Sequence, residues 1–220
     1  MKLIGILFLT AVLGSCTADT VVLNQLMDQV IESMKMVINQ GGMNELTVPD
    51  MNNDWHYRWH FIKLSGHANC HDGKARSLAS LRRTGDATVT TVGNKAIVKV
   101  RLGFGDLEFN FGRCQFKAKH LFSVSQHIKV KINSNSVELQ VSLTGQGPKC
   151  VASLDHVVLD QFGGVKIDTG GGIIHNIEDK LLQWATRHFH DTIVGVVNDK
   201  LADAVRKALP KIDLCSKIPH

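Results

Sequence analysis

The sequence is poor in the features that mark several large classes of protein. Its 220 residues include only 4 prolines and 1 tyrosine, and aromatic residues make up 6%. There is no low-complexity tract and no internal repeat, and hydrophobic residues reach 44%, so a disordered chain is not expected and a sizeable core can form. After the first residues, no segment approaches the roughly 18 consecutive apolar residues that a membrane-spanning helix requires.

Blocks of like charge and catalytic motifs are also missing. The formal net charge is +5, but Lys and Arg are scattered, and no basic stripe alternates with aromatic residues. Nucleic acid is therefore not expected as a partner. No nucleophile elbow, paired Cys/His signature or metalloprotease motif is present, and the acidic residues are dispersed. These absences favour a protein that is not an enzyme and needs no cofactor.

The first 18 residues have the pattern of a secretory signal peptide. Lys2 is followed by an apolar run over residues 3–13, and then by small residues up to Ala18. Cleavage is expected after Cys16 or Ala18, which predicts a secreted, extracellular protein. With the signal peptide taken as residues 1–18, a single domain is expected over residues 19–220. An alternative is a bacterial lipoprotein box, "LGSC", in which Cys16 carries the lipid.

Four cysteines remain once this leader is removed. They are Cys70, Cys114, Cys150 and Cys215. An even number in a secreted chain predicts two disulfides. Three pairings are possible, and the sequence does not choose among them.

Hydrophobic spacing predicts a helix followed by strands. Residues 20–40 repeat apolar side chains every three or four positions, which is typical of an amphipathic helix. Residues 43–54 are interpreted as a connector. Residues 55–70 alternate like one strand with a single change of phase, which a bulge would explain. Residues 72–85 are polar and are predicted to be irregular.

Long antiparallel strands are predicted over residues 86–144. The alternation changes phase at Gly103 and Gly105, where a bulge or turn would redirect the strand. The alternating runs at 124–132 and 137–143 are separated by "NSNS", which predicts a hairpin turn at residues 133–136. A second turn is predicted at residues 145–148. The expected arrangement is a meander with one apolar face.

The last segment predicts a long helix over residues 173–209, ended by Pro210. A helix of that length is about 55 Å long. A flat sheet of a small domain would not cover such a stripe, so the strands are expected to extend along it and curl around it. The predicted fold is therefore α+β: a long, strongly curved antiparallel sheet wrapped around a long C-terminal helix, with an amphipathic N-terminal helix.

Other side-chain groups could suggest a metal, anion or carbohydrate site. The histidines of "HANCH" (67–71) and "HFH" (188–190) could suggest a metal, but Cys70 is better used in a disulfide, and residues 188 and 190 point apart on a helix. We expect no metal. The glycines at 170–172 are interpreted as a turn rather than an anion site, and Trp55, Tyr57 and Trp59 as core or cavity rim rather than a carbohydrate platform.

Two segments resemble a known family. "SLRRTGDATV" (80–89) and "FGGVKIDTGGGIIHNIEDKLLQWATRHFHDTI" (162–193) are similar to the mite group 7 allergen family, and the order of the predicted elements matches. That family is similar to insect juvenile-hormone-binding and takeout proteins and to bactericidal permeability-increasing proteins, the tubular lipid-binding superfamily. The resemblance implies an arthropod source, an apolar groove or tunnel, and non-catalytic binding of a lipid-like ligand.

An enzyme of unrecognised type would need convergent polar groups in a pocket, which the sequence does not show. Two other functions are compatible with these expectations. The first is a secreted binding protein for a lipid or another hydrophobic small molecule. The alternative is an immune or interaction protein that acts through a protein partner and has little internal cavity. A monomer or weak dimer is expected. The apolar positions expected to line a groove or tunnel are Ile62, Leu64, Val98, Val100, Leu102, Leu107, Phe109, Phe111, Ile128, Val130, Leu139, Val141, Ile177, Leu181 and Trp184.

Overall fold

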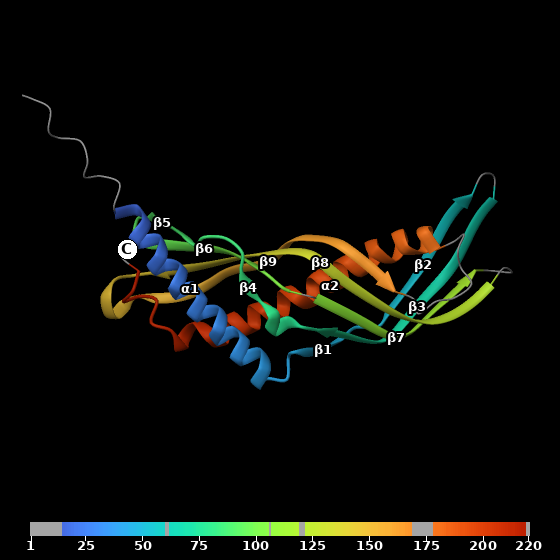
Figure 1. The fold of residues 1–220 in the computed structure, drawn as a ribbon, viewed down its shortest axis with the longest axis horizontal. Helices are drawn as coiled ribbons and strands as arrows, with labels where there is room; N and C mark the ends of the chain where they lie inside the picture. Colours follow the sequence, from blue (N-terminus) through green and yellow to red (C-terminus); the bar gives the residue numbers. More distant parts are fainter. Residues whose placement is uncertain (1–14, 60–61, 106, 119–121, 169–177, 219–220) are drawn as a thin grey trace, which may run out of the picture.

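A curved antiparallel sheet lies along two long helices (Figure 1). The structure is a computed structural model that describes residues 15–59, 62–105, 107–118, 122–168 and 178–218. The predicted α+β fold, with its curved sheet and its N- and C-terminal helices, is confirmed. The helices are α1 (Ser15–Gln40) and α2 (Glu178–Ala208), with short 3-10 helices η1 (Leu78–Ser80), η2 (Gly147–Lys149) and η3 (Leu209–Lys211). The strands are β1 (Glu45–Val48), β2 (Met51–Trp59), β3 (Ile62–Arg76), β4 (Arg82–Arg83), β5 (Thr88–Val92), β6 (Lys95–Gly103), β7 (Leu107–Ala118), β8 (Phe122–Thr144) and β9 (Val151–Asp168).

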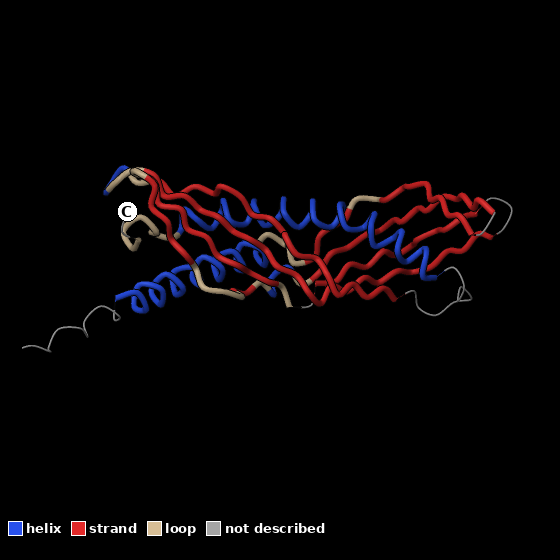
Figure 2. The backbone as a smooth tube through the Cα atoms, turned by 90° about the horizontal axis from the view of Figure 1, so that it is seen from above, coloured by secondary structure: helices blue, strands red, loops and turns tan. Residues whose placement is uncertain are grey.

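The two helices cover different lengths of the sheet. Helix α2 has 31 residues, about 46 Å, and runs along most of the molecule. Helix α1 lies along one half only, where it contacts α2, η1 and β4. Figure 2 shows the strands following the same long axis as α2. Among the described helices, none combines the length and the apolar character needed to cross a membrane.

Strand β8 is the centre of the sheet. It continues for 23 residues without a break. Strand β9 pairs with one of its edges, and β7 and β6 pair one after the other with the opposite edge. Because β6 and β7 keep the same register against β8, the break between Gly103 and Leu107 interrupts what is otherwise one long strand. The phase change predicted at Gly103 and Gly105 is located at this interruption.

The hairpin turn predicted at residues 133–136 is wrong, because β8 runs straight through this polar segment. The side chain of Asn135 explains the polar composition. Its Oδ1 accepts a hydrogen bond of 2.6 Å from the Phe104 backbone N–H, and its Nδ2 donates to the Phe104 carbonyl at 3.4 Å. The side chain thus bonds the backbone where the neighbouring strand is interrupted. The second predicted turn is confirmed, and it contains η2.

Three further predictions about strands need correction. Residues 43–54 are not a plain connector, because they contain β1 and the start of β2. The single strand over residues 55–70 is two antiparallel strands, and the phase change marks the step from Trp59 to Ile62. Residues 72–85 are partly regular, since β3 continues to Arg76. The first of these errors has a clear cause. In β1, exposed Glu45 and Thr47 alternate with buried Leu46 and Val48, but four residues are too few for the alternation to mark a strand.

The outer face of the sheet is covered by ion pairs between neighbouring strands. Arg101 on β6 contacts Asp160 at 2.7 Å and Glu138 at 3.7 Å. Glu45 on β1 contacts Lys74 and Arg76 on β3. These cross-strand pairs keep the outer face polar, while the alternating apolar side chains face the helices.

Glu108 is the best buried carboxylate of these outer pairs. Its side chain is 19% exposed, and it contacts Lys131 at 2.9 Å and Lys129 at 3.0 Å. Hydrogen bonds from Lys131 and Lys129 lower the pKa of Glu108 below its ordinary value of 4.5. A carboxyl group with a lowered pKa in the folded state stabilises the fold above the pKa of the unfolded chain, and this contribution disappears as the pH falls through the folded pKa.

We therefore expect Glu108→Gln to lower the free energy of unfolding by about 1 kcal/mol at pH 7. The difference from the wild type should shrink as the pH falls below 4.5, because the unfolded chain, and at lower pH the folded protein, binds a proton at Glu108. Urea unfolding at several pH values measures it. Asp199→Asn, an exposed change on α2, is the control and should change stability by less than about 0.5 kcal/mol. A difference that stays constant down to pH 3 would contradict the prediction.

Candidate functional site

The inner face of the sheet is a continuous apolar surface. Ten of the residues predicted to line a groove or tunnel have described side chains, and each is at most 2% exposed. They lie on β6, β7 and β8 and pair across the strands, for example Val100 with Leu139 and Phe109 with Val130. The ten are Val98, Val100, Leu102, Leu107, Phe109, Phe111, Ile128, Val130, Leu139 and Val141.

The other five predicted residues cannot be placed beside them. Ile177 lies outside the described residues. The side chains of Ile62, Leu64, Leu181 and Trp184 are also outside the described part of the chain. Their participation in a site remains a prediction.

One half of the inner face is filled by helix side chains. Met27, Val30 and Met34 of α1 are at most 1% exposed, and they belong to the same buried cluster as Val100 and Leu139. The second half of α2 adds Ile193, Val197 and Leu201 to that cluster, each at most 1% exposed. This half of the molecule is therefore packed protein core.

A polar clasp holds α1 in this position. Arg83 donates to both carboxylate oxygens of Asp28, with Nε–Oδ1 at 2.9 Å and a terminal nitrogen at 3.2 Å from Oδ2. The hydrogen bonds to Asp28 raise the pKa of Arg83. Asn24 accepts a bond of 2.8 Å from the Ala87 N–H and donates to Asp86 at 2.9 Å. The "RRTGDA" segment (82–87) is part of the stretch that resembles the family, and its contacts therefore position α1.

The other half of the inner face extends beyond α1. It consists of β2, the first part of β3, the end of β7 and the start of β8, and α2 is the described helix that reaches it (Figure 1). Its described inward side chains include Ala68, Cys70, Cys114 and Phe116, and each is at most 4% exposed. On this part of the inner face, small side chains on β3 thus lie next to a phenylalanine on β7.

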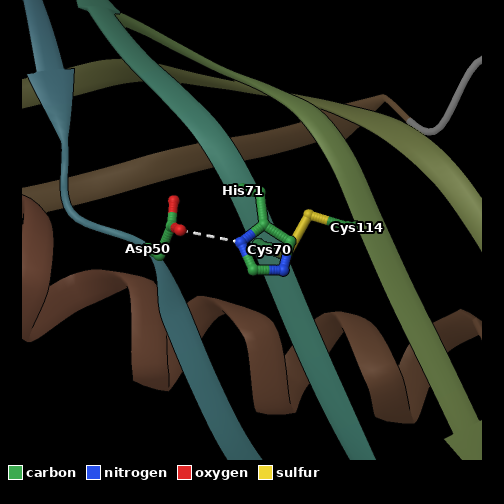
Figure 3. Close-up of a disulfide and its surroundings, with 4 residues drawn as sticks. All are labelled: Asp50, Cys70, His71 and Cys114. Carbon is green, nitrogen blue, oxygen red and sulfur yellow. Dashed lines mark hydrogen bonds and ion pairs between the residues drawn. A yellow bond between two sulfur atoms is a disulfide. The ribbon is translucent and has the colours of Figure 1, made fainter.

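The two expected disulfides are present. Cys70 and Cys114 join directly paired positions of β3 and β7, with a Cα–Cα distance of 4.0 Å (Figure 3). Cys150 and Cys215 join the end of the β8–β9 turn to the C-terminal segment. Next to Cys70, His71 uses Nδ1 to contact Asp50 Oδ2 at 2.8 Å, on the outer face of the sheet.

A second feature is the seam between the edge strand β9 and helix α2. The side chains of Phe162, Val165 and Ile167 pack against the core but stay partly exposed. Phe162 meets the ring of His190 edge-on, with ring centres 5.1 Å apart. Nearby, the Leu159 N–H donates to Asn198 Oδ1 at 2.7 Å, which attaches α2 to the strand edge. Apolar side chains are therefore accessible where strand and helix meet.

The sequence reasoning did not identify the residues of this seam, nor Ala68 and Phe116. A signal existed in β9, where Val157, Leu159, Phe162, Val165 and Ile167 are apolar. Their spacing is irregular between Leu159 and Phe162, where a register shift at residue 160 changes the phase against β8, and again between Phe162 and Val165. The strict two-residue period that marks a strand is lost as a result.

The histidines considered for a metal make other contacts where they are described. His67 Nδ1 lies 2.8 Å from Asp54 Oδ1 on the outer face, and His190 contacts Asp191 at 2.9 Å. Within the described residues, no three His, Cys, Asp or Glu side chains come together as metal ligands would. The glycines at 170–172 lie outside the described residues.

Comparison with known proteins places the chain in a family. The sequence profile of the Group 7 allergen family matches residues 22–209. No curated protein sequence matches significantly. Among solved structures, the fold is similar to a lipopolysaccharide binding protein, with 12% identity and a TM-score of 0.48 over 89% of this chain and 37% of that one. It is also similar to Takeout 1 of Epiphyas postvittana, with 15% identity and a TM-score of 0.44 over 86% of this chain and 93% of that one.

The chain thus corresponds to 37% of the length of the lipopolysaccharide binding protein. The family match, in contrast, spans most of the present sequence. It includes the "RRTGDA" segment (82–87), most of α1, all of α2 and the whole sheet between them. The resemblance noted in the sequence is confirmed, and the chain belongs to the Group 7 allergen family.

Proposed function

We propose that this protein is a secreted, non-catalytic binding protein for an elongated hydrophobic molecule such as a lipid, formed by a single domain over residues 19–220. The ligand would lie between the inner face of the sheet and α2, in the half of the molecule beyond α1. The observation that carries the proposal is that the apolar inner face extends past the helix that fills it elsewhere.

The distribution of polar groups supports binding rather than catalysis. The described inward side chains are apolar. The described ion pairs of the strands, such as Arg101–Asp160 and Glu108–Lys131, lie on the outer face. Among the residues whose side chains are described, the buried polar ones are Ser136 and Ser142, and they bond the outer-face groups Arg101 and Asp155. The inner face can therefore remove apolar surface from water, but its described side chains offer no proton donor or acceptor.

The seam between β9 and α2 suggests how a ligand would reach this space. Phe162, Val165 and Ile167 are partly exposed, so an alkyl chain approaching along this edge would meet an apolar surface. Burying eight methylene groups would contribute about 6 kcal/mol before the cost of association is subtracted. We therefore expect micromolar affinity for a single-chain lipid, with the polar head remaining at the surface.

Displacement of a fluorescent fatty acid tests the proposal. Ala68→Trp places a large side chain on the inner face beyond α1, where the proposed ligand would lie, and should weaken binding of the probe at least about tenfold, which corresponds to about 1.4 kcal/mol. The matched control is Ala152→Trp, an inner-face alanine at the opposite end of the sheet that is only partly buried. It should bind the probe like the wild type.

Circular dichroism confirms that both variants fold. Native mass spectrometry of the protein purified without detergent should show the added mass of a co-purified lipid. If the folded wild type binds no probe, or if folded Ala68→Trp binds as tightly as the wild type, the proposed site is wrong. A wild type without lipid that captures a protein partner would support the alternative function.

A further inference from the structure

Strand β5 has an unusual composition for an edge strand. Its sequence is TVTTV, so all five residues are β-branched, the type that favours extended backbone. All five are exposed. It pairs with β6 along one edge, and within the described part of the chain no strand pairs with the other. Alternate N–H and C=O groups of β5 therefore point outward with the spacing that another strand requires.

The usual protections of an edge strand are missing from β5. Natural proteins blunt exposed edges with lysine, proline, bulges or a covering helix. β5 contains no charged residue and no proline, and its pairing with β6 is regular over all five residues. By contrast, the edge strand β9 carries two register shifts and has α2 attached to it through Asn198.

Exposed apolar side chains gather around the same edge. The described residues include seven exposed large apolar side chains, and four of them, Val21, Val22, Val89 and Val92, are on β5 or on the first turns of α1. Those turns lie beside the start of β5, because Asn24 bonds Asp86 and Ala87 (Figure 1). Val21 is 54% and Val89 is 44% exposed. Exposed apolar side chains are therefore present both on the strand and on the neighbouring part of the helix.

From these observations we propose that β5 pairs with β5 of a second copy of this chain. An antiparallel, two-fold arrangement centred on Thr90 places Thr90 opposite Thr90, Val89 opposite Thr91, and Thr88 opposite Val92. Every facing pair is then β-branched, and no like charges meet, since the strand is uncharged. A charged strand would place like charges near each other in a symmetric pair.

The geometry also brings the two α1 helices together. A two-fold axis perpendicular to the sheet keeps the inner faces of both copies on the same side. The exposed valines at the start of each α1 then lie next to the junction and add apolar area to a short strand pair. The interface is separate from the proposed ligand site, which lies in the half of the molecule beyond α1.

Sedimentation equilibrium over a range of concentrations tests the dimer. The wild type should dimerise with a micromolar dissociation constant, and Thr90→Lys should raise that constant about tenfold or more, because it places two like charges opposite each other. Thr47→Lys is the matched control, since Thr47 is also an exposed threonine on an edge strand, β1. It should leave the dimer unchanged.

A cross-link locates the axis. In the mature protein, whose cysteines at 70, 114, 150 and 215 are paired, Thr90→Cys should form an intermolecular disulfide on mild oxidation, because directly opposed Cβ atoms lie about 5 Å apart. Thr47→Cys should stay monomeric under the same conditions. A wild type that is monomeric at 100 μM-scale concentrations, or a dimer that Thr90→Lys and Thr47→Lys affect equally, would overturn the proposal. Capture of a foreign strand by a monomeric wild type would overturn it as well.

Discussion

Replacing Phe111 by alanine is expected to lower the free energy of unfolding by about 4 kcal/mol. The side chain is 0% exposed and lies at the centre of the sheet. Its ring covers Gly73 on β3, because a Cβ at that glycine would lie 2.8 Å from Cε1 of Phe111 and 2.9 Å from Cβ of Val48. Removing the ring would leave a cavity next to a residue without a side chain, so the neighbours would have little to fill it with.

Urea unfolding monitored by circular dichroism measures this effect. Phe162→Ala, the same change at a half-buried position of β9, should cost only about 1–2 kcal/mol. Gly73→Ala should also destabilise, because it forces the ring away, and combining it with Phe111→Leu should cost less than the sum of the two changes. If Phe111→Ala lowered the free energy of unfolding no more than Phe162→Ala does, the prediction that the Phe111 ring packs tightly on Gly73 would be wrong.

Removing the Cys150–Cys215 disulfide is expected to have a similarly large effect. The bond closes a loop between residues 65 positions apart. In the chain-entropy account, opening a loop of this size costs about 4 kcal/mol of stability. The bond also attaches a C-terminal segment whose Leu214 and Ile218 are at most 4% exposed. The segment buries apolar surface, but it is short and would detach more easily without the covalent link.

The measurement compares Cys150→Ser, Cys215→Ser and the double variant by urea unfolding. The three should agree within about 0.5 kcal/mol, because any one change breaks the bond. Thiol titration of the denatured, unreduced mature wild type should find no free cysteine. A loss below about 1 kcal/mol, or two free thiols in the wild type, would show that this disulfide does not stabilise the protein.

The sequence predicted the parts of the fold that depend on local periodicity. Helix α1 and the end of α2 lie close to their predicted positions, because their apolar stripes repeat over many turns. The alternation in β6 also identified its inward residues, Val98, Val100 and Leu102. All three are buried. Periodicity is a strong signal here because one face of each element must be removed from water.

Features that depend on contacts between distant segments were not predicted. Asn133–Ser136 has the composition of a turn, and only the pairing of Asn135 with Phe104 explains why the strand continues. Likewise, Asp72 adopts a φ of 57° next to the Cys70–Cys114 disulfide. At this point the alternation of inward and outward side chains shifts by one residue in both β3 and β7. For the candidate site, the sequence identified the inward residues of β6–β8 but not the seam between β9 and α2, since bulges conceal its period.

The uninterrupted strand β8 has a consequence for the order of folding. Strands β6 and β7 emerge from the ribosome before β8, and each needs β8 as a partner, while β9 and α2 are made later still. The sheet therefore cannot close until most of the chain has been synthesised. The pairings of β6 with β8 and of β3 with β7 join segments that are distant in sequence. Such pairings make folding slow, in the range of milliseconds to seconds, and leave strand edges open meanwhile. Nascent chains stalled before β8 should remain bound to chaperones, whereas chains extended past Ala208 should become protease-resistant.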